Sequence, residues 1–520
     1  MIFSSYPFIL VFLPIVLAGV AALRVAAARL PGGGIWAVRV AMLGWIAAAS
    51  LVFYVDWNPV HLPLLLGSVA ANYALGRAIP HARTPARANA LVALGTAIDL
   101  GVLGYFKYRA FALESVAALA GTELDLPPLV LPLAVSFFTF QQIAWLVDVR
   151  RGRVAVESPL RYLFFVSFFP QLIAGPIVHY NEIMPQVRAP GWLRLDRRLF
   201  AAGVAMFAIG LGKKVLVADA MAPAVDAVYA QAAGGGAVST LAAWGGAVGF
   251  GLQLYFDFSA YADMALGLAA MLGLHLPINF WSPYRAGSVI GFWRRWHITL
   301  ARFLRDHVYI PLGGNRRGPT RQAGNMLATM LLGGLWHGAG WTYVLWGGVH
   351  GVMLVLNHAW RGLRARLALP RPLAAALAGT GAVLAFAGIM LAWLPFRAPD
   401  IGTARRMAAA ALTPGLDGVA RPDVWNLVLA VPEGRPVGLA IWCILGLLAV
   451  WLLPNSHRLS ARFDPEIQGT GTIAREARAT ARPVRGVGPL LLGTLSGFLI
   501  LASLKALLVA PSKEFFYFAF

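Results

Sequence analysis

The stretch LLGGLWHGAGWTYVLWGGVHG, residues 331–351, has the apolar composition of a membrane span, yet glycines interrupt it and His337 lies within it. Backbone breaks of this kind are tolerated at membrane depth only where protein or a water-filled cavity satisfies the freed hydrogen-bonding groups. The stretch therefore predicts a broken or re-entrant helical segment inside a membrane protein that crosses the bilayer many times.

The composition of the whole chain supports a membrane protein. Its 520 residues are 59% hydrophobic and only 12% charged, whereas a soluble domain has a charged fraction of about 25%. The 17 tryptophans exclude a disordered or nucleic-acid-binding chain, in spite of a net charge of +21. At ~20 apolar residues per span, the apolar windows predict about eleven transmembrane helices with a few re-entrant or interfacial segments. We expect an all-α polytopic membrane protein.

Positive charge is unevenly distributed along the chain. The 457–485 loop holds six arginines, whereas acidic side chains balance the arginines of the 413–435 stretch. The positive-inside rule places 457–485 in the cytoplasm and 413–435 on the other side of the membrane. Most of the net charge is thus explained by topology and by anionic lipid headgroups, and it does not indicate an acidic substrate.

A second basic segment, residues 293–321, carries seven arginines against the single acid Asp306; the arginines are at 294, 295, 302, 305, 316, 317 and 321. Its apolar residues recur at helical spacing, which predicts an amphipathic helix in the headgroup plane. The segment could be an interfacial anchor in anionic lipid, or a cytosolic collar that attracts a phosphate-bearing donor. The residues alone favour the anchor, which is the common role of basic surface helices.

Two histidines are the candidate reactive groups. His337 is flanked by Trp336 and Trp341 and by glycines, which are Gly333, Gly334 and Gly338. The glycines could let a thin group pass the imidazole, or they could serve tight helix packing; the residues alone do not decide. His297 lies on the apolar side of the basic segment. Ionisable residues in the membrane are functional by default, although a buried histidine can also be simply satisfied by the backbone.

The intramembrane carboxylates do not form an acid/base pair by their spacing. Asp257 and Asp263 are six residues apart, hence about 120° apart on a helix. We expect Asp257 to form a hydrogen bond or to pair with an arginine, which would hold helices in register. His179 and Glu182 are a single isolated pair of possible metal ligands. The sequence has no Cys-x-x-Cys or His-Glu-x-x-His pattern. No metal site is predicted.

Four strings in order along the chain resemble one known family. They are FFPQLIAGPIVHYNEI (168–183), LYFDFSAYADMALG (254–267), FWRRWHITLARFLRDHVYIPLGGNR (292–316) and GGLWHGAGWTYVLWGGVHG (333–351). They resemble the membrane-bound O-acyltransferase family, in particular its bacterial alginate O-acetylation branch. The resemblance extends over nearly the whole chain and implies a single membrane domain, residues 1–520, with a catalytic core segment at 254–360 and a cytoplasmic basic loop at 457–485.

The resemblance implies a fold of about eleven spans around a central pore that narrows near the essential histidine, which corresponds to His337. The family's second histidine corresponds to His297. On this hypothesis the residues that bind the acyl donor are Trp336, Trp341, Arg294, Arg295, Arg302, Arg305 and Asn315. Orienting or structural roles fall to Asp257, Asp263, Gly333, Gly334 and Gly338. His337 would act as general base or as a covalent acyl carrier.

The implied activity is transfer of acetyl groups from a cytoplasmic donor, acetyl-CoA, through the bacterial inner membrane for O-acetylation of a secreted polysaccharide such as alginate. No bound cofactor is expected. The implied partners are a periplasmic acetyltransferase of the Ser-Gly-Asn-His type, a polysaccharide synthesis and export complex and membrane lipids, without nucleic acid. Alternatives within the family are a D-alanyl or a lipid acyltransferase. Alternatives from other classes are a transporter or channel and a scaffold that recruits an export complex.

Overall fold

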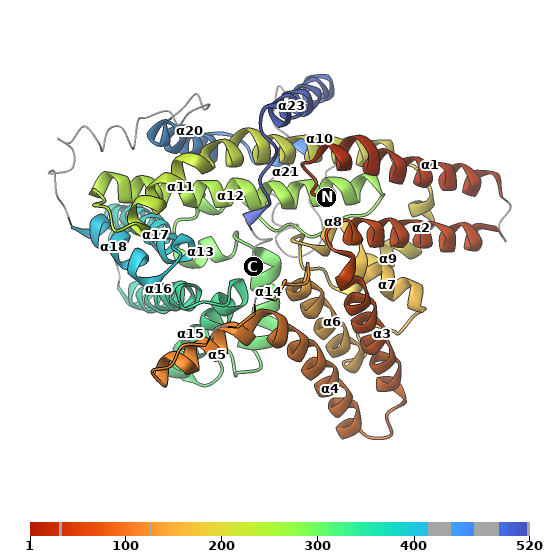
Figure 1. Cartoon of the computed structure of the whole chain (residues 1–520), viewed down its shortest axis with the longest axis horizontal. Coiled ribbons are helices and arrows are strands. Elements are labelled where there is room, and N and C mark those ends of the chain that lie inside the picture. The colour runs from red at the N-terminus through yellow and green to blue at the C-terminus, as the bar shows by residue number, and fades with distance from the viewer. Residues whose placement is uncertain are drawn as a thin grey trace. The chain divides into compact units, whose positions relative to one another are not determined.

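The computed structural model describes residues 1–30, 34–124, 126–127, 129–367, 369–413, 438–461 and 488–516. Every regular element within these ranges is a helix (Figure 1). The chain divides into two compact units. The first unit comprises Met1–Leu211, Tyr261–Ile278 and Ser456–Ala519, and the second comprises Gly212–Ala260 and Asn279–Asn455.

The first unit is built largely from helical hairpins, in which α1 packs against α2 and α3 against α4 (Figure 1). Its main helices are α1 (Leu13–Arg29), α2 (Ile35–Val55), α3 (Leu62–Ala78), α4 (Pro85–Leu103), α5 (Arg109–Leu119), α6 (Val135–Arg150), α7 (Pro159–Ser167), α8 (Phe169–Leu172), α9 (Tyr180–Arg188), α10 (Arg197–Gly212), α21 (Ser456–Ser460) and α23 (Pro489–Val509). Short 3-10 or π segments join several of them, namely Pro7–Phe12, Pro59–His61, Ile79–His81, Gly104–Tyr108 and Pro190–Leu193.

The start of α4 shows how the sequence sets a helix boundary. The Thr84 hydroxyl accepts a hydrogen bond from the amide N–H of Arg87 at 3.2 Å, and Pro85 occupies the first turn. Threonine satisfies one of the N–H groups that a helix start leaves without a partner, and proline has the backbone angle that the first turn needs. The turn between α3 and α4 is therefore short and fixed at Thr84.

The second unit contains the central part of the chain. Its helices are α11 (Asp219–Ala233), α12 (Thr240–Met271, whose last residues belong to the first unit), α13 (Val289–Trp293), α14 (Ile298–Leu304), α15 (Gly318–His337), α16 (Trp341–Arg366), α17 (Arg371–Arg397), α18 (Ile401–Leu412) and α20 (Leu439–Leu452). It also includes the π segments Lys213–Ala218 and Arg305–Tyr309 and the 3-10 turn Pro283–Arg285.

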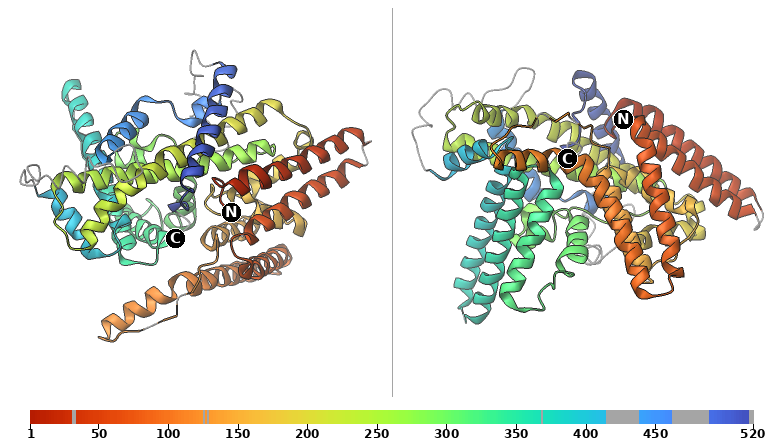
Figure 2. Two further views of the ribbon diagram at one scale, coloured as in Figure 1. Left: turned by 45° about the horizontal axis from the view of Figure 1, so that its top comes forward. Right: turned by 60° about the horizontal axis from the view of Figure 1, so that its bottom comes forward.

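The glycine-rich stretch forms the ends of α15 and α16, which lie side by side (green and blue-green in the right-hand view of Figure 2). A Cβ atom on Gly334 would lie 2.2 Å from the carbonyl oxygen of Tyr343, and one on Gly347 would lie 2.3 Å from that of Met330. Neither position can accept a larger residue without moving backbone. Of the two interpretations of these glycines, the structure favours tight helix packing.

The spacing of the apolar residues predicted one amphipathic helix over the basic segment. This prediction is wrong. The segment divides into α13, a turn, α14 and a π segment before α15 begins. The break falls at His297, whose φ of 43° is left-handed. Asn279 causes the new start, because its carbonyl oxygen accepts from the amide N–H of Ile298 and its side-chain oxygen from that of Thr299. A partner distant in sequence thus overrides the local helical pattern.

Seven described helical segments are long and apolar enough to cross a membrane. They are Pro7–Arg29, Ile35–Val55, Pro59–His81, Pro85–Leu119, Arg197–Ala233, Arg371–Arg397 and Leu490–Val509. These spans and the helical architecture confirm an all-α polytopic membrane protein. The total of about eleven spans and the central pore stay predictions. The basic loop lies outside the described residues from position 462 onward, as does nearly all of 413–435.

Candidate functional site

The two candidate histidines come together in the second unit. His337 is the last residue of α15, and His297 occupies the turn between α13 and α14. Their ring centroids are 6.3 Å apart, and both side chains are buried. Forty residues of sequence separate them, so the fold brings together two imidazoles that the sequence could identify only one at a time.

Aromatic rings surround both imidazoles. The His337 ring lies 5.0 Å from Trp336, 5.0 Å from Trp346 and 5.4 Å from Phe396, in edge-to-face arrangements. The His297 ring lies 4.7 Å from Phe258, again edge to face. Such walls lower the local dielectric and strengthen any electrostatic interaction made between them. The two imidazoles therefore lie in a buried, largely aromatic environment.

Asn279 holds His297 in one orientation. The Asn279 side-chain oxygen lies 3.1 Å from His297 Nδ1, and it also accepts hydrogen bonds from the amide and the hydroxyl of Thr299. Because the backbone N–H of Thr299 can only donate, the Asn279 atom is the oxygen, and Nδ1 of His297 must carry the proton. The other ring nitrogen, Nε2, then has the lone pair. Burial lowers the pKa of His297 to about 3, which keeps the imidazole neutral.

The structure separates the two tryptophans that the sequence had grouped with His337. Trp336 is buried against both histidines, with its ring 6.1 Å from that of His297. Trp341 begins α16 and is 59% exposed. The sequence reasoning missed Trp346 and Phe396 as ring neighbours of His337. Trp346 was visible in the same string at helical spacing, whereas nothing near Phe396 in the sequence indicated its position.

A cavity of about 470 Å³ adjoins the basic segment in the second unit. Three of the predicted donor-binding residues line it, namely Arg294, Arg305 and Asn315, and so does Arg361 from α16. Arg295 and Arg302 are not among its lining residues. Arg305 Nε donates to Asp306 Oδ1 at 2.7 Å, which neutralises part of its charge.

A smaller cavity of about 330 Å³ shares Arg294 and Arg361 with the first and adds Arg364 and Trp360. The two cavities therefore border the same two arginines, one from the basic segment and one from α16. Guanidinium groups are the side chains best suited to phosphate oxygens, because they donate in a planar fork. The arginines that line the two cavities have the chemistry that suits phosphate groups.

The intramembrane carboxylates have structural partners. Lys214 Nζ lies 2.7 Å from Asp257 Oδ1 and 2.9 Å from Asp219 Oδ1, and all three side chains are buried. Asp257 forms a hydrogen bond, as the sequence predicted, and the donor is the ammonium group of Lys214. In the first unit, Asp263 lies 3.8 Å from His457 Nε2. The two aspartates thus have separate partners.

Within the described part of the chain, no three His, Cys, Asp or Glu residues are close enough to hold a metal ion. His179 and Glu182, the one pair with ligand spacing, instead cap the start of α9: the His179 amide donates to Glu182 at 2.9 Å. His179 Nδ1 also lies 3.3 Å from Asp148 Oδ2.

Known proteins resemble this chain along its whole length. The sequence model of the membrane-bound O-acyltransferase family matches residues 150–394. A protein named probable alginate O-acetylase from Azotobacter vinelandii is 35% identical over 533 residues, with 100% of both chains covered. A peptidoglycan O-acetyltransferase from Helicobacter pylori is 40% identical over 400 residues, which cover 72% of this chain and 74% of that protein. The chain belongs to the membrane-bound O-acyltransferase family.

Membership makes this chain a multi-pass membrane protein and an O-acyltransferase. The matched range of the O-acyltransferase family includes both histidines, Asn279 and Lys214. A teichoic acid D-alanyltransferase from Streptococcus thermophilus is also similar, at 30% identity over 44% of this chain and 57% of that protein. The residue roles within this O-acyltransferase stay predictions, because the likeness concerns the chain and not single side chains.

Proposed function

We propose that this O-acyltransferase takes acetyl groups from acetyl-CoA on the cytoplasmic side of a bacterial inner membrane and passes them across for O-acetylation of a secreted polysaccharide such as alginate. The main support for this proposal is the pair of buried imidazoles, whose ring centroids lie 6.3 Å apart among aromatic side chains. Imidazole exchanges protons near neutral pH and can also accept an acyl group. Relatives named for O-acetylation of alginate and of peptidoglycan support a polysaccharide as the final acceptor.

In the proposed reaction the acceptor hydroxyl attacks the thioester carbonyl, so that a C–O bond forms and the C–S bond breaks. His337 takes the proton of the hydroxyl as general base, and the departing thiolate receives a proton and leaves as free CoA. His297 can accept a hydrogen bond at Nε2 and orients the donor or relays the proton. Alternatively, a His337 ring nitrogen attacks the thioester carbonyl, so that a C–N bond forms, the C–S bond breaks and CoA leaves as the protonated thiol. The acceptor hydroxyl then attacks the acetyl group, a C–O bond forms, and the C–N bond breaks to restore the imidazole.

The arginine-lined cavities are the proposed donor entrance. Coenzyme A carries several phosphate charges, and Arg294 and Arg361 border both cavities. Clustered cations raise the local concentration of an anionic substrate and increase its association rate. The basic segment would thus bind the nucleotide end of the donor at the cytoplasmic surface, while the thioester end reaches the histidines.

The acceptor side of the proposal requires partners. Transfer to a secreted polymer needs a group that receives acetyl outside the cytoplasm, and a periplasmic Ser-Gly-Asn-His acetyltransferase is the partner we propose. A polysaccharide synthesis and export complex would supply the polymer. Copurification of such a protein with this O-acyltransferase from the native membrane checks this part.

The test of the function uses the native strain. We expect His337→Ala to abolish O-acetyl groups on the secreted polymer while the variant remains in the membrane at the normal amount. His307→Gln is the matched control, because His307 lies on the same basic segment but stacks on Phe303 with its centroid 4.5 Å away. Normal polymer acetylation in the His337→Ala strain would falsify the proposal.

A second experiment distinguishes His337 as general base from His337 as covalent acyl carrier. It also distinguishes acetyl transfer from D-alanyl transfer. Purified membranes receive radiolabelled acetyl-CoA without acceptor, and protein-bound label that disappears in His337→Ala identifies a covalent carrier. The similarity to teichoic acid D-alanyltransferases makes D-alanyl transfer the second candidate. D-alanyl esters on the polymer, in place of acetyl esters, would favour that candidate.

A further inference from the structure

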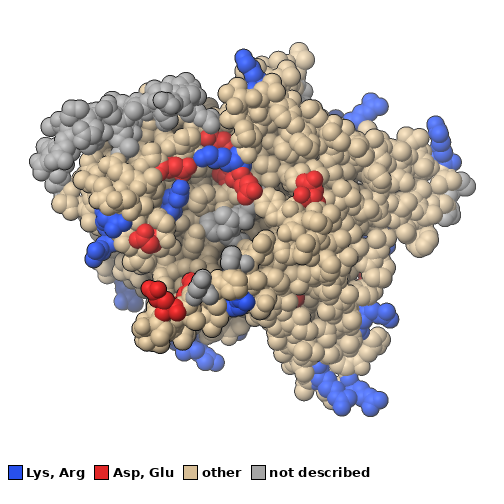
Figure 3. Space-filling view, viewed as in Figure 1, with Lys and Arg blue, Asp and Glu red and all other residues tan. Residues whose placement is uncertain are grey.

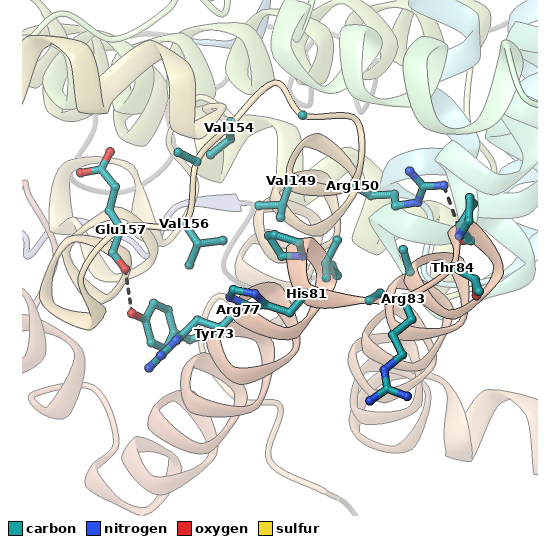
Figure 4. Close-up of a pocket in the computed structure, with 17 residues that line it drawn as sticks. Tyr73, Arg77, His81, Arg83, Thr84, Val149, Arg150, Val154, Val156 and Glu157 are labelled. Carbon is teal, nitrogen blue, oxygen red and sulfur yellow. Dashed lines mark hydrogen bonds between the residues drawn. The ribbon is translucent and has the colours of Figure 1, made fainter.

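A separate cavity of about 890 Å³ lies in the first unit at the tip of the α3–α4 hairpin. Its walls come from the end of α3, the Ile79–His81 turn, the start of α4, the end of α6, Gly152 and residues 154–157 (Figure 4). Both hairpin helices belong to candidate membrane spans, Pro59–His81 and Pro85–Leu119. The cavity therefore lies where two candidate spans end, which is where a helix that crosses the bilayer meets the lipid headgroups.

Three arginines line this cavity, Arg77, Arg83 and Arg150, and Glu157 is the one carboxylate among its lining residues. The negative charge of Glu157 is already neutralised. Its two carboxylate oxygens pair with Arg161 and with Arg188, which do not line the cavity. Figure 4 shows that the Tyr73 hydroxyl reaches the backbone of Glu157, donating to its carbonyl oxygen at 2.7 Å. The arginines are thus not balanced from within the cavity.

Arg150 is held in place without being neutralised. Its Nε donates to the Asn89 side-chain oxygen at 2.8 Å, and its NH2 group lies 3.5 Å from the carbonyl oxygen of Pro85. Both acceptors are uncharged. Arg77 and Arg83 are exposed and form no ion pair with any described carboxylate. In the space-filling view, basic side chains gather at the tip of this hairpin (Figure 3).

We propose that this cavity binds a phosphate group, and that the ligand is the headgroup of an anionic membrane phospholipid. Guanidinium groups bind phosphate oxygens through charge-assisted hydrogen bonds, and basic pockets at the ends of spans bind anionic headgroups. Apolar wall residues, among them Val149, Val154 and Val156, suit the first carbons of the acyl chains of such a lipid. Free inorganic phosphate offers the same group, so the test must separate the two sources. The site is independent of the acyl-transfer chemistry.

The test uses the full-length protein in neutral detergent. Its thermal unfolding midpoint is followed during titration with short-chain phosphatidylglycerol, with the zwitterionic phosphatidylcholine of equal chain length, and with inorganic phosphate at constant ionic strength. We expect phosphatidylglycerol to raise the midpoint and phosphatidylcholine to have little effect. Arg77→Gln/Arg83→Gln should weaken the apparent affinity for phosphatidylglycerol by about 25-fold, at about fivefold per arginine.

The matched control is Arg87→Gln/Arg151→Gln. It removes the same charge from exposed positions on α4 and just after α6 that do not line the cavity. Retained phosphatidylglycerol affinity in the control supports the site. An equal loss in both double variants, or no loss in either, overturns it. If inorganic phosphate binds as tightly and with the same dependence on Arg77 and Arg83, the phosphate site is supported and the lipid is overturned as its source.

Discussion

Two buried polar sites in the described part of the second unit differ in electrostatic character. One is the trio of Lys214, Asp219 and Asp257, in which an ammonium group lies 2.7 and 2.9 Å from two carboxylate oxygens. The other is the pair His297 and His337, imidazole rings packed among aromatic side chains. Burial is similar in both sites, but the first is held together by ion pairs.

This difference distinguishes polar groups that stabilise the fold from polar groups that are available for a reaction. Buried charges that face one another are costly to part, because removing one partner leaves the other without compensation. Such a cluster fixes the helices that carry it. A neutral imidazole carries a lone pair at no such cost and can take up a proton during a reaction. Substitutions in the two sites should therefore have different consequences, one for activity and one for folding.

The largest expected effect is on turnover at the histidine site. His337→Ala should lower acetyl transfer in purified membranes by about 10²- to 10⁴-fold, the usual contribution of general acid-base catalysis. The unfolding midpoint should change little in comparison. A rate within a few-fold of the native rate would contradict the division between the two sites.

The charged trio should show the reverse pattern. Lys214→Met leaves Asp219 and Asp257 without their shared ammonium group, and we expect a loss of about 3–5 kcal/mol in the free energy of unfolding. Chemical denaturation in detergent measures this loss. The double variant Lys214→Met/Asp257→Asn should recover part of it, because one carboxylate is removed. Normal stability of Lys214→Met would show that the trio is not structural.

Asn279 connects the reactive site to the backbone, so its substitution should affect both activity and stability. Asn279→Ala removes the acceptor of His297 Nδ1 and of two donors from Thr299. We expect turnover to fall about tenfold and stability to fall by about 1–3 kcal/mol. Asn279→Asp retains an acceptor oxygen and should preserve more turnover than the alanine variant. Equal activities of the two variants would argue against an orienting role.

The smallest effect concerns donor binding. Arg294 borders both cavities of the proposed donor entrance, and Arg294→Gln should raise the KM for acetyl-CoA about fivefold with little change in kcat, the pattern of lost uniform binding. The matched control is Arg316→Gln, an exposed arginine of the same segment that lines neither cavity. Its KM should stay near the native value. A drop in kcat for Arg294→Gln would instead place this arginine at the reacting end.

The sequence predicted those features that depend on local composition. Apolar length identified the membrane helices, and the unusual histidines drew attention to His297 and His337. Features made by distant contacts were missed. Asn279 is 18 residues from His297, and its hydrogen bonds decide where the basic segment breaks. Phe396 belongs to the end of α17, so only the packing of that helix places its ring against His337.

The ring contacts around His337 also bear on the size of the acyl group that fits beside it. Trp336, Trp346 and Phe396 approach its imidazole to centroid distances of 5.0–5.4 Å, and we therefore expect a short acyl group to need less rearrangement beside it than a fatty acyl chain. Interiors packed this closely resist such rearrangement. Smaller side chains at Trp346 or Phe396 should widen the range of acyl groups accepted.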